Sequence, residues 1–114
     1  MKLIKNASAE KLRGGFYTPD PIASFILKWG INGSVDSDIL EPSCGDGVFL
    51  EQLKENKFRY NSVTAVEFDE IEAEKANKID LVNKTVINTD FHLYCNETNQ
   101  RFDLVVGNPP YIRY

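Results

Sequence analysis

The run Asn108-Pro109-Pro110-Tyr111 carries the most specific chemistry in this sequence. Two consecutive prolines fix their own φ angles, restrict the preceding residue to extended conformations and donate no hydrogen bonds. The Asn108 side-chain oxygen and the Pro109 carbonyl can therefore hold both hydrogens of an aromatic amine and favour a more tetrahedral nitrogen aimed at a methyl donor. Tyr111 can stack on the ring that bears the amine. The alternative interpretation is a proline-terminated edge strand with a packing tyrosine.

A second cluster is the glycine-punctuated turn Pro42-Ser43-Cys44-Gly45-Asp46-Gly47. Gly45 and Gly47 allow the backbone to approach a ligand closely and leave helix N–H groups pointing outward, towards a polar or anionic group. The turn lacks the full G-x-G-x-x-G pattern, because Leu50 occupies the third position, and a tight turn alone would explain two glycines. Glu67 stands twenty residues after Gly47, where an acidic side chain can accept both hydroxyls of a ribose. Together these residues favour a nucleoside cofactor.

The pair Asp90-Phe91 follows a further strand-like segment. The carboxylate could accept a hydrogen bond from an adenine amino group, and the phenyl ring could stack on the base. An aspartate at the end of a strand is equally ordinary turn chemistry. The order of the motifs along the chain, with the glycine turn first, then the acid and then Asp-Phe, favours the cofactor interpretation.

These motifs need elements that bring them together, and strand-like and helix-like segments alternate as in parallel α/β units. We expect strands over 38–41, 62–66, 85–88 and 102–106. Each polar motif then falls at the carboxyl end of a strand, where open parallel sheets bind their ligands.

The expected helices run from Thr18-Pro19, over about 48–55 and over about 69–78. Thr18 can cap the first of them and proline fits its first position, whereas Asp69 and Glu72 offer a capping-box-like start to the third. In the first helix we expect one face to pack in the core, formed by Ile22, Phe25, Ile26 and Trp29. The stretch 90–101 is polar and weakly patterned.

The composition, 42% hydrophobic and 26% charged, is that of one soluble globular domain, with no long apolar segment for a membrane or a secretion signal. The protein is therefore expected in the cytoplasm. Cys44 and Cys95 stand far apart with His92 as the single histidine, which predicts reduced thiols, no metal site and no disulfide. The net charge of -4 argues against strong nucleic-acid binding by this piece alone, so contacts to DNA are expected mostly from other parts of the protein.

The sequence resembles the S-adenosylmethionine-dependent adenine-N6 DNA methyltransferases of restriction-modification systems. The matching segments follow the family's order and cover essentially the whole chain: 14–19 (Gly-Gly-Phe-Tyr-Thr-Pro), 41–50 (Glu-Pro-Ser-Cys-Gly-Asp-Gly-Val-Phe-Leu), 66–69 (Val-Glu-Phe-Asp), 89–91 (Thr-Asp-Phe) and 107–111 (Gly-Asn-Pro-Pro-Tyr).

The resemblance implies a role for each motif. Tyr17 and Thr18 would meet the methionine portion of S-adenosylmethionine. The segment from Glu41 to Gly47 would line its pocket, with Ser43, Gly45 and Asp46 among the contacts. Glu67 would hold the ribose with Phe68 beside it, and Asp90 and Phe91 would hold the cofactor adenine. The target base, an adenine flipped out of duplex DNA, would be held by Asn108, Pro109, Pro110 and Tyr111.

The resemblance also implies an α/β fold, the Rossmann-like class I methyltransferase fold with three αβα layers. A complete member has further strands and a separate target-recognition region. Residues 1–114 are therefore expected to be the N-terminal, cofactor-binding part of a catalytic domain, with a partial parallel sheet in the strand order 3-2-1-4. The fourth strand would be an unpaired edge, through which the isolated chain is expected to self-associate.

Three functions remain open on the sequence. The first is methylation of adenine N6 in DNA. The second is methylation of another planar amide or amine, such as a protein glutamine or an RNA adenine, because Asn-Pro-Pro-Tyr also occurs in those relatives. Against it stands the Phe-Tyr-Thr-Pro segment ahead of the glycine turn, an arrangement associated with the DNA enzymes. The third is a cofactor-binding module without turnover of its own.

Overall fold

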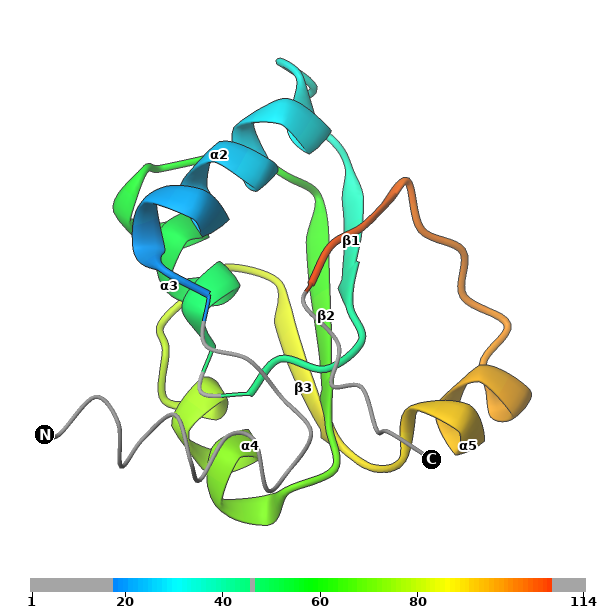
Figure 1. Ribbon diagram of the computed structural model, residues 1–114. Helices are drawn as coiled ribbons and strands as arrows, with labels where there is room; N and C mark the ends of the chain where they lie inside the picture. The colour runs from blue at the N-terminus through cyan, green and yellow to red at the C-terminus, as the bar shows by residue number, and fades with distance from the viewer. Residues whose placement is uncertain (1–17, 46, 108–114) are drawn as a thin grey trace, which may run out of the picture.

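The structure, a computed structural model, describes residues 18–45 and 47–107. Its middle layer is a parallel sheet of β1 (Asp38–Glu41), β2 (Ser62–Glu67), β3 (Lys84–Asn88) and β4 (Leu104–Val105), in the order β3-β2-β1-β4. On one face lie α2 (Asp20–Ile31), α3 (Val48–Glu55) and α4 (Glu70–Asn77), and on the other lies α5 (Phe91–Glu97) (Figure 1). The parallel sheet, its strand order and the three layers confirm the expected fold.

Side chains alternate between the two faces of the sheet, as strand geometry requires. Ile39 of β1 and Val63 of β2 face the main core, which α2, α3 and α4 cover. On the opposite face, Leu40 of β1 and Val66 of β2 pack in a smaller cluster with Tyr94 of α5. The polar ends of the strands are thus held on a sheet that is packed from both sides.

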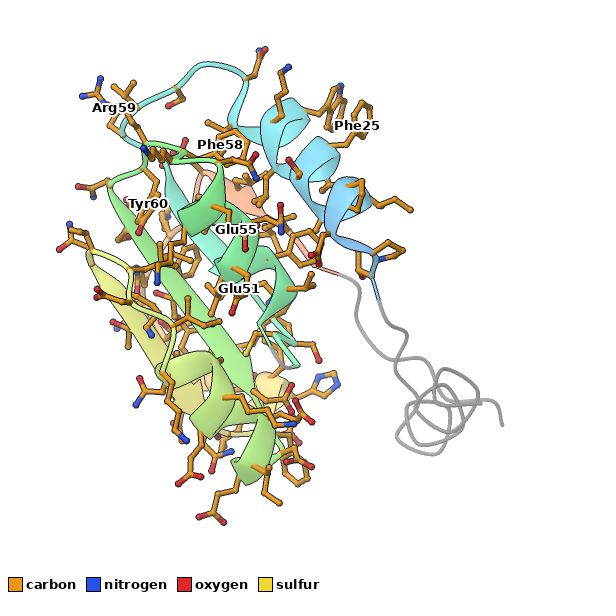
Figure 2. The ribbon with its side chains drawn as sticks, turned by 90° about the vertical axis from the view of Figure 1, so that its left-hand side faces the viewer. Phe25, Glu51, Glu55, Phe58, Arg59 and Tyr60 are labelled. Carbon is orange, nitrogen blue, oxygen red and sulfur yellow. The ribbon has the colours of Figure 1, made fainter. Side chains whose placement is uncertain are left out.

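The face of α2 that packs in the core differs from the expected one. Its buried residues are Ala23, Leu27 and Ile31, whereas Phe25 and Trp29 are 69% and 77% exposed. Figure 2 shows Phe25 pointing away from the rest of the protein. Apolar residues surround most of this helix, so periodicity alone does not single out one face.

Ile22 is also exposed, and Ile26 is only partly buried against the core. The buried face of α2 carries small and aliphatic side chains, which allow close packing against the sheet. Gly30 shows how close this packing is, because a Cβ atom there would lie 2.8 Å from the Leu104 side chain of β4. The helix begins at Asp20 with Pro19 as its N-cap, which corrects the expected Thr18 cap.

The helix α4 is fixed at both ends by side chains. Asp69 is its N-cap and accepts the N–H groups of Ile71 (2.9 Å) and Glu72 (3.1 Å). The expected capping box is only half formed, because the N–H of Asp69 donates to Glu67 Oε2 (2.7 Å). At the other end Lys84 Nζ donates to the carbonyls of three residues at the end of α4 and after it, Ala76, Asn77 and Ile79.

Two elements depart from the sequence-based expectation in the second half of the chain. The helix α5 occupies part of the stretch that looked unpatterned, because Asp90 caps it through the N–H of His92 (2.8 Å) and Tyr94 buries its one inward face. The strand β4 spans two residues in place of the expected 102–106. None of the helices in the described part of the chain is long and apolar enough to cross a membrane.

Candidate functional site

The glycine turn after β1 is clamped between the carboxyl ends of β1 and β2. Three consecutive backbone N–H groups of the turn donate to these strand ends: Ser43 to Glu41 Oε2 (2.7 Å), Cys44 to the Val66 carbonyl (3.0 Å) and Gly45 to Glu67 Oε1 (2.8 Å). Two of the three acceptors are side-chain oxygens of acids at the strand ends, Glu41 and Glu67, and the third is a backbone carbonyl. The turn is therefore preorganised, and the two acids predicted from the sequence lie on either side of it.

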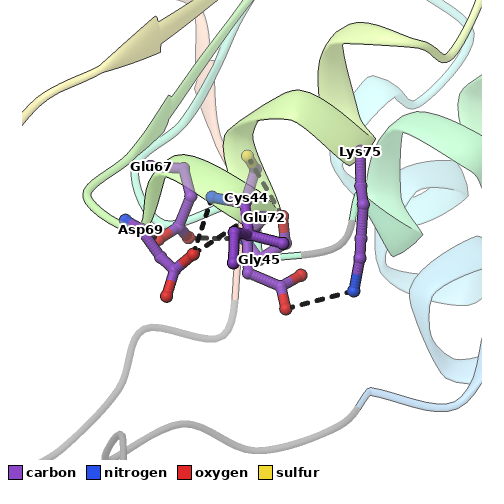
Figure 3. Close-up of polar contacts among 7 residues, drawn as sticks. Cys44, Gly45, Glu67, Asp69, Glu72 and Lys75 are labelled. Atoms are coloured by element: carbon purple, nitrogen blue, oxygen red, sulfur yellow. Dashed lines mark hydrogen bonds and ion pairs between the residues drawn. The ribbon is translucent and has the colours of Figure 1, made fainter.

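Glu67, the last residue of β2, fixes the glycine turn relative to the start of α4. Its Oε1 accepts the N–H of Gly45, and its Oε2 accepts the N–H of Asp69, so it joins the glycine turn to the start of α4 (Figure 3). A carboxylate has room for about four hydrogen bonds, and these two leave capacity for a ligand. Glu67 is half-buried, so part of its surface remains accessible.

Glu41 is in a different environment from Glu67. Only 2% of its surface is exposed, and burial raises the pKa of its carboxyl to about 8. The Ser43 N–H acts in the opposite direction on this pKa, and the negative charge of Glu67 raises it further. Near neutral pH the Glu41 carboxyl therefore carries a proton in this structure.

The two predicted glycines serve different purposes. Gly47 has φ 94° and packs on α4, where a Cβ atom would lie 2.6 Å from the Ile79 side chain. Gly45 has φ 54°, and a Cβ atom there would meet no atom of the described residues within 4 Å. Gly47 is thus explained by packing, whereas Gly45 leaves open space beside the Glu67 carboxylate.

The end of β3 brings the remaining cofactor candidates to the same edge of the sheet. Thr89 N–H donates to the Glu67 carbonyl (3.1 Å), which places Asp90 next to the end of β2. Asp90 is exposed and caps α5. Phe91 packs on Tyr94, with ring centroids 6.4 Å apart, and so also serves the smaller core cluster. Phe68 is 77% exposed at the end of β2 and is free to stack on a planar ligand.

Several predicted residues lie outside the described part of the chain, namely Tyr17, Asp46, Asn108, Pro109, Pro110 and Tyr111. Thr18, the first described residue, is buried, and Ser43 is half-buried. Gly107 is the last described residue, and it directly precedes Asn108 at the carboxyl end of β4.

Two residues of the site were assigned no role from the sequence. Asn88 Nδ2 donates to the carbonyls of Glu67 (2.8 Å) and Phe68 (2.9 Å) and so fixes the backbone between them. An asparagine as the last residue of a strand was the available signal. Gly107 packs against Glu41, which no sequence pattern indicates because the residues are far apart in the chain.

The described residues contain no group of side chains that could hold a metal ion. Cys44 is buried and Cys95 is exposed, and neither forms a disulfide among the described residues. The strand ends therefore offer hydrogen-bond acceptors, backbone donors and an exposed aromatic ring.

Comparison with known proteins decides the family. The family model described as Eco57I restriction-modification methylase matches residues 17–114. The chain belongs to this family. The match includes the glycine turn, both acids and the segment that begins at Asn108.

The chain is also similar to individual methyltransferases. The Type II methyltransferase M.CvrRI of Paramecium bursaria Chlorella virus XZ-6E is 33% identical over 97% of this chain and 30% of its own length. The tRNA1(Val) (adenine(37)-N6)-methyltransferase of Haemophilus influenzae is 32% identical over 65% of this chain and 34% of its own length. The chain thus spans about a third of the length of these relatives.

Solved structures show the same fold. A putative class I S-adenosylmethionine-dependent methyltransferase from Listeria monocytogenes superimposes with a TM-score of 0.67 at 20% identity, over 89% of this chain and 34% of the other. Together with the parallel sheet in the order β3-β2-β1-β4, this similarity establishes the class I methyltransferase fold. The candidate site of this chain therefore lies beyond the carboxyl ends of the strands, where open parallel sheets bind their ligands.

Proposed function

We propose that the enzyme containing this chain transfers a methyl group from S-adenosylmethionine to the N6 amino group of adenine in DNA, within a restriction-modification system. The observation that carries the proposal is the pair of acids at the ends of β1 and β2, which hold the glycine turn through Ser43 and Gly45. It is supported by membership of a restriction-modification methylase family. Residues 1–114 would be the N-terminal, cofactor-binding part of the catalytic domain.

S-Adenosylmethionine fits the residues at the strand ends, and when bound it supplies an electrophilic methyl group. Glu67 would accept the ribose hydroxyls with the lone pairs that Gly45 and Asp69 leave unused. Phe68, exposed beside it, would cover one side of the nucleoside. The cofactor adenine would lie towards Asp90 and Phe91, and the methionine portion towards Tyr17, Thr18 and the turn with Asp46.

The target adenine would be bound by the segment after β4. Asn108 and the Pro109 carbonyl would accept the two amine hydrogens, Pro110 would keep the segment rigid, and Tyr111 would stack on the base. A base inside a duplex cannot reach such a segment, so the adenine must be flipped out of the DNA. This chain has a net charge of -4, so contacts to the DNA backbone would come mostly from other parts of the enzyme.

A second candidate is methylation of an adenine in RNA. It is favoured by the similarity to a tRNA adenine-N6-methyltransferase, which covers 65% of this chain. The same amine chemistry serves both substrates, because the acceptors bind the amino group and not the sugar. The region that distinguishes the polymers is not among the described residues.

The deciding experiment is methyl transfer by the complete enzyme from methyl-labelled S-adenosylmethionine to duplex DNA, to tRNA and to a release-factor protein. We expect label in DNA, recovered as N6-methyladenine after digestion to nucleosides. Asn108→Ala should reduce turnover on the order of 100-fold while the dissociation constant for S-adenosylmethionine stays nearly the same, because the side chain acts in the transition state.

Asn99→Ala is the matched control, because it removes an exposed asparagine amide from the connection between α5 and β4. Label in tRNA or protein in place of DNA would transfer the proposal to that substrate. Binding of S-adenosylmethionine without transfer to any of the three would indicate a cofactor-binding module. An equal loss of affinity and turnover in Asn108→Ala would indicate a structural role for that residue.

A further inference from the structure

Gly107 packs directly on the carboxyl group of Glu41. The two lie side by side because β4 and β1 are neighbours, with the Val106 N–H donating to the Leu40 carbonyl (2.9 Å). A Cβ atom at Gly107 would lie 3.2 Å from Glu41 Oε2 and 3.4 Å from Pro42 Cδ. The first distance is shorter than ordinary van der Waals contact. Any larger residue at position 107 must therefore displace either the carboxyl group or its own backbone.

The same carboxyl oxygen also fixes the glycine turn. Glu41 Oε2 accepts the Ser43 N–H at 2.7 Å, the shortest of the three bonds that clamp this turn. Because Glu41 is 2% exposed, its side chain cannot move into solvent without leaving a cavity. One buried group thus contacts both the turn after β1 and the residue that precedes Asn108.

We propose that Glu41 is a positioning residue that sets the distance between the glycine turn and Gly107, the residue that directly precedes Asn108. The inference rests on the proposed function, in which the turn holds the methyl donor and Asn108 the amine. Methyl transfer requires the two reacting atoms to be aligned at close range, and a displacement of about 1 Å can cost on the order of 100-fold in rate. A rigid spacer between the turn and Gly107 would maintain that alignment.

The protonation state of Glu41 supports the role of a spacer. Burial keeps its carboxyl protonated near neutral pH, so Gly107 packs on an uncharged group and no isolated charge is left without solvent. A side chain in this state contributes shape and one hydrogen bond.

The test is a double-mutant cycle in the complete enzyme with Gly107→Ala and Glu41→Asp. Gly107→Ala adds the Cβ atom, and we expect kcat for methyl transfer to fall about 10- to 100-fold with the KM for S-adenosylmethionine changed less than about threefold. Glu41→Asp withdraws the carboxyl by one methylene group and makes room for the Cβ atom. The double variant should therefore be at least about threefold more active than the product of the two single effects.

Gly30→Ala is the control, because its Cβ atom would press on β4 from α2 through Leu104 and not through Glu41. Its effect should combine with Glu41→Asp without coupling. Independent effects in the Gly107→Ala cycle, or full activity in Gly107→Ala, would overturn the proposal. If wild-type enzyme methylates none of the substrates, the proposed function fails. The coupling between positions 41 and 107 can still be measured in that case, from the free energies of unfolding of the same four proteins.

Gly107→Ala by itself could fail to fold, and the double variant still gives a decision. Recovery of a cooperatively folding protein in Gly107→Ala/Glu41→Asp would support the packing relation, because only a shorter side chain at position 41 makes room for the added atom. Failure of the double variant, with Glu41→Asp alone folded, would overturn it.

Discussion

The buried carboxyl of Glu41 should make the stability of the protein depend on pH. Its pKa is raised by burial from 4.5 to about 8. Between these values the folded protein binds a proton that the unfolded chain has lost, so the free energy of unfolding decreases as pH rises through this window. Glu41→Gln removes the ionisation and keeps the size and an acceptor for Ser43. The stability of the variant relative to wild type should therefore rise as pH increases from 4.5 to 8, by about 5 kcal/mol over the whole window.

Chemical denaturation of the ligand-free protein at both ends of this pH range measures the difference. Glu51→Gln is the control, because it makes the same chemical change at an exposed position of α3. The two variants should diverge as the pH is raised. A stability difference between wild type and Glu41→Gln that is constant with pH would show that Glu41 ionises normally in the folded protein.

At the scale of elements, α4 depends on a side chain that lies next to the site. Asp69 accepts two N–H groups in the first turn of this helix, and its own N–H is held by Glu67. Asp69→Ala should lower the free energy of unfolding by about 1 kcal/mol, the usual cost of losing an N-cap. Glu74→Ala removes a negative charge from an exposed position of the same helix and should cost less. Equal losses in urea denaturation would mean that charge, and not capping, accounts for the effect.

At the scale of the whole molecule, the outer edge of β4 pairs with no other strand of the described residues. Val105 is 59% exposed, so an apolar side chain stands at a sheet edge that no other described strand covers. The strand has only two residues, fewer than the sequence predicted. A short edge offers fewer backbone groups for pairing with another chain, so self-association should be weaker than expected. We still predict that the 114-residue chain self-associates as its concentration rises and that Val105→Lys reduces this association.

Light scattering over a concentration series measures the effect, with Val82→Lys as a control at an exposed valine away from β4. A monomer at all concentrations would contradict the prediction. Association that survives Val105→Lys but is lost in Trp29→Lys would locate the contact on α2, whose exposed apolar stripe includes Phe25.

The sequence by itself determined the strands, their order through the family resemblance, and the clustering of polar motifs at strand ends. Local signals were sufficient here. Glu41 and Glu67 are the last residues of β1 and β2, a turn with two glycines follows β1, and Asp69 is a strong N-cap immediately before α4. The chemistry of Asn108 and Tyr111 was likewise read from adjacent residues, and it remains a prediction.

Only the tertiary structure decided which apolar residues of α2 are buried. Phe25 and Leu27 both have apolar side chains, but Leu27 faces the core and Phe25 faces solvent. It decided the protonation of Glu41, since burial and not residue type raises the pKa. It also brought Gly107 against Glu41 across the sheet. In each case the deciding energy is desolvation or packing between segments far apart in sequence, and these depend on distances that no local pattern specifies.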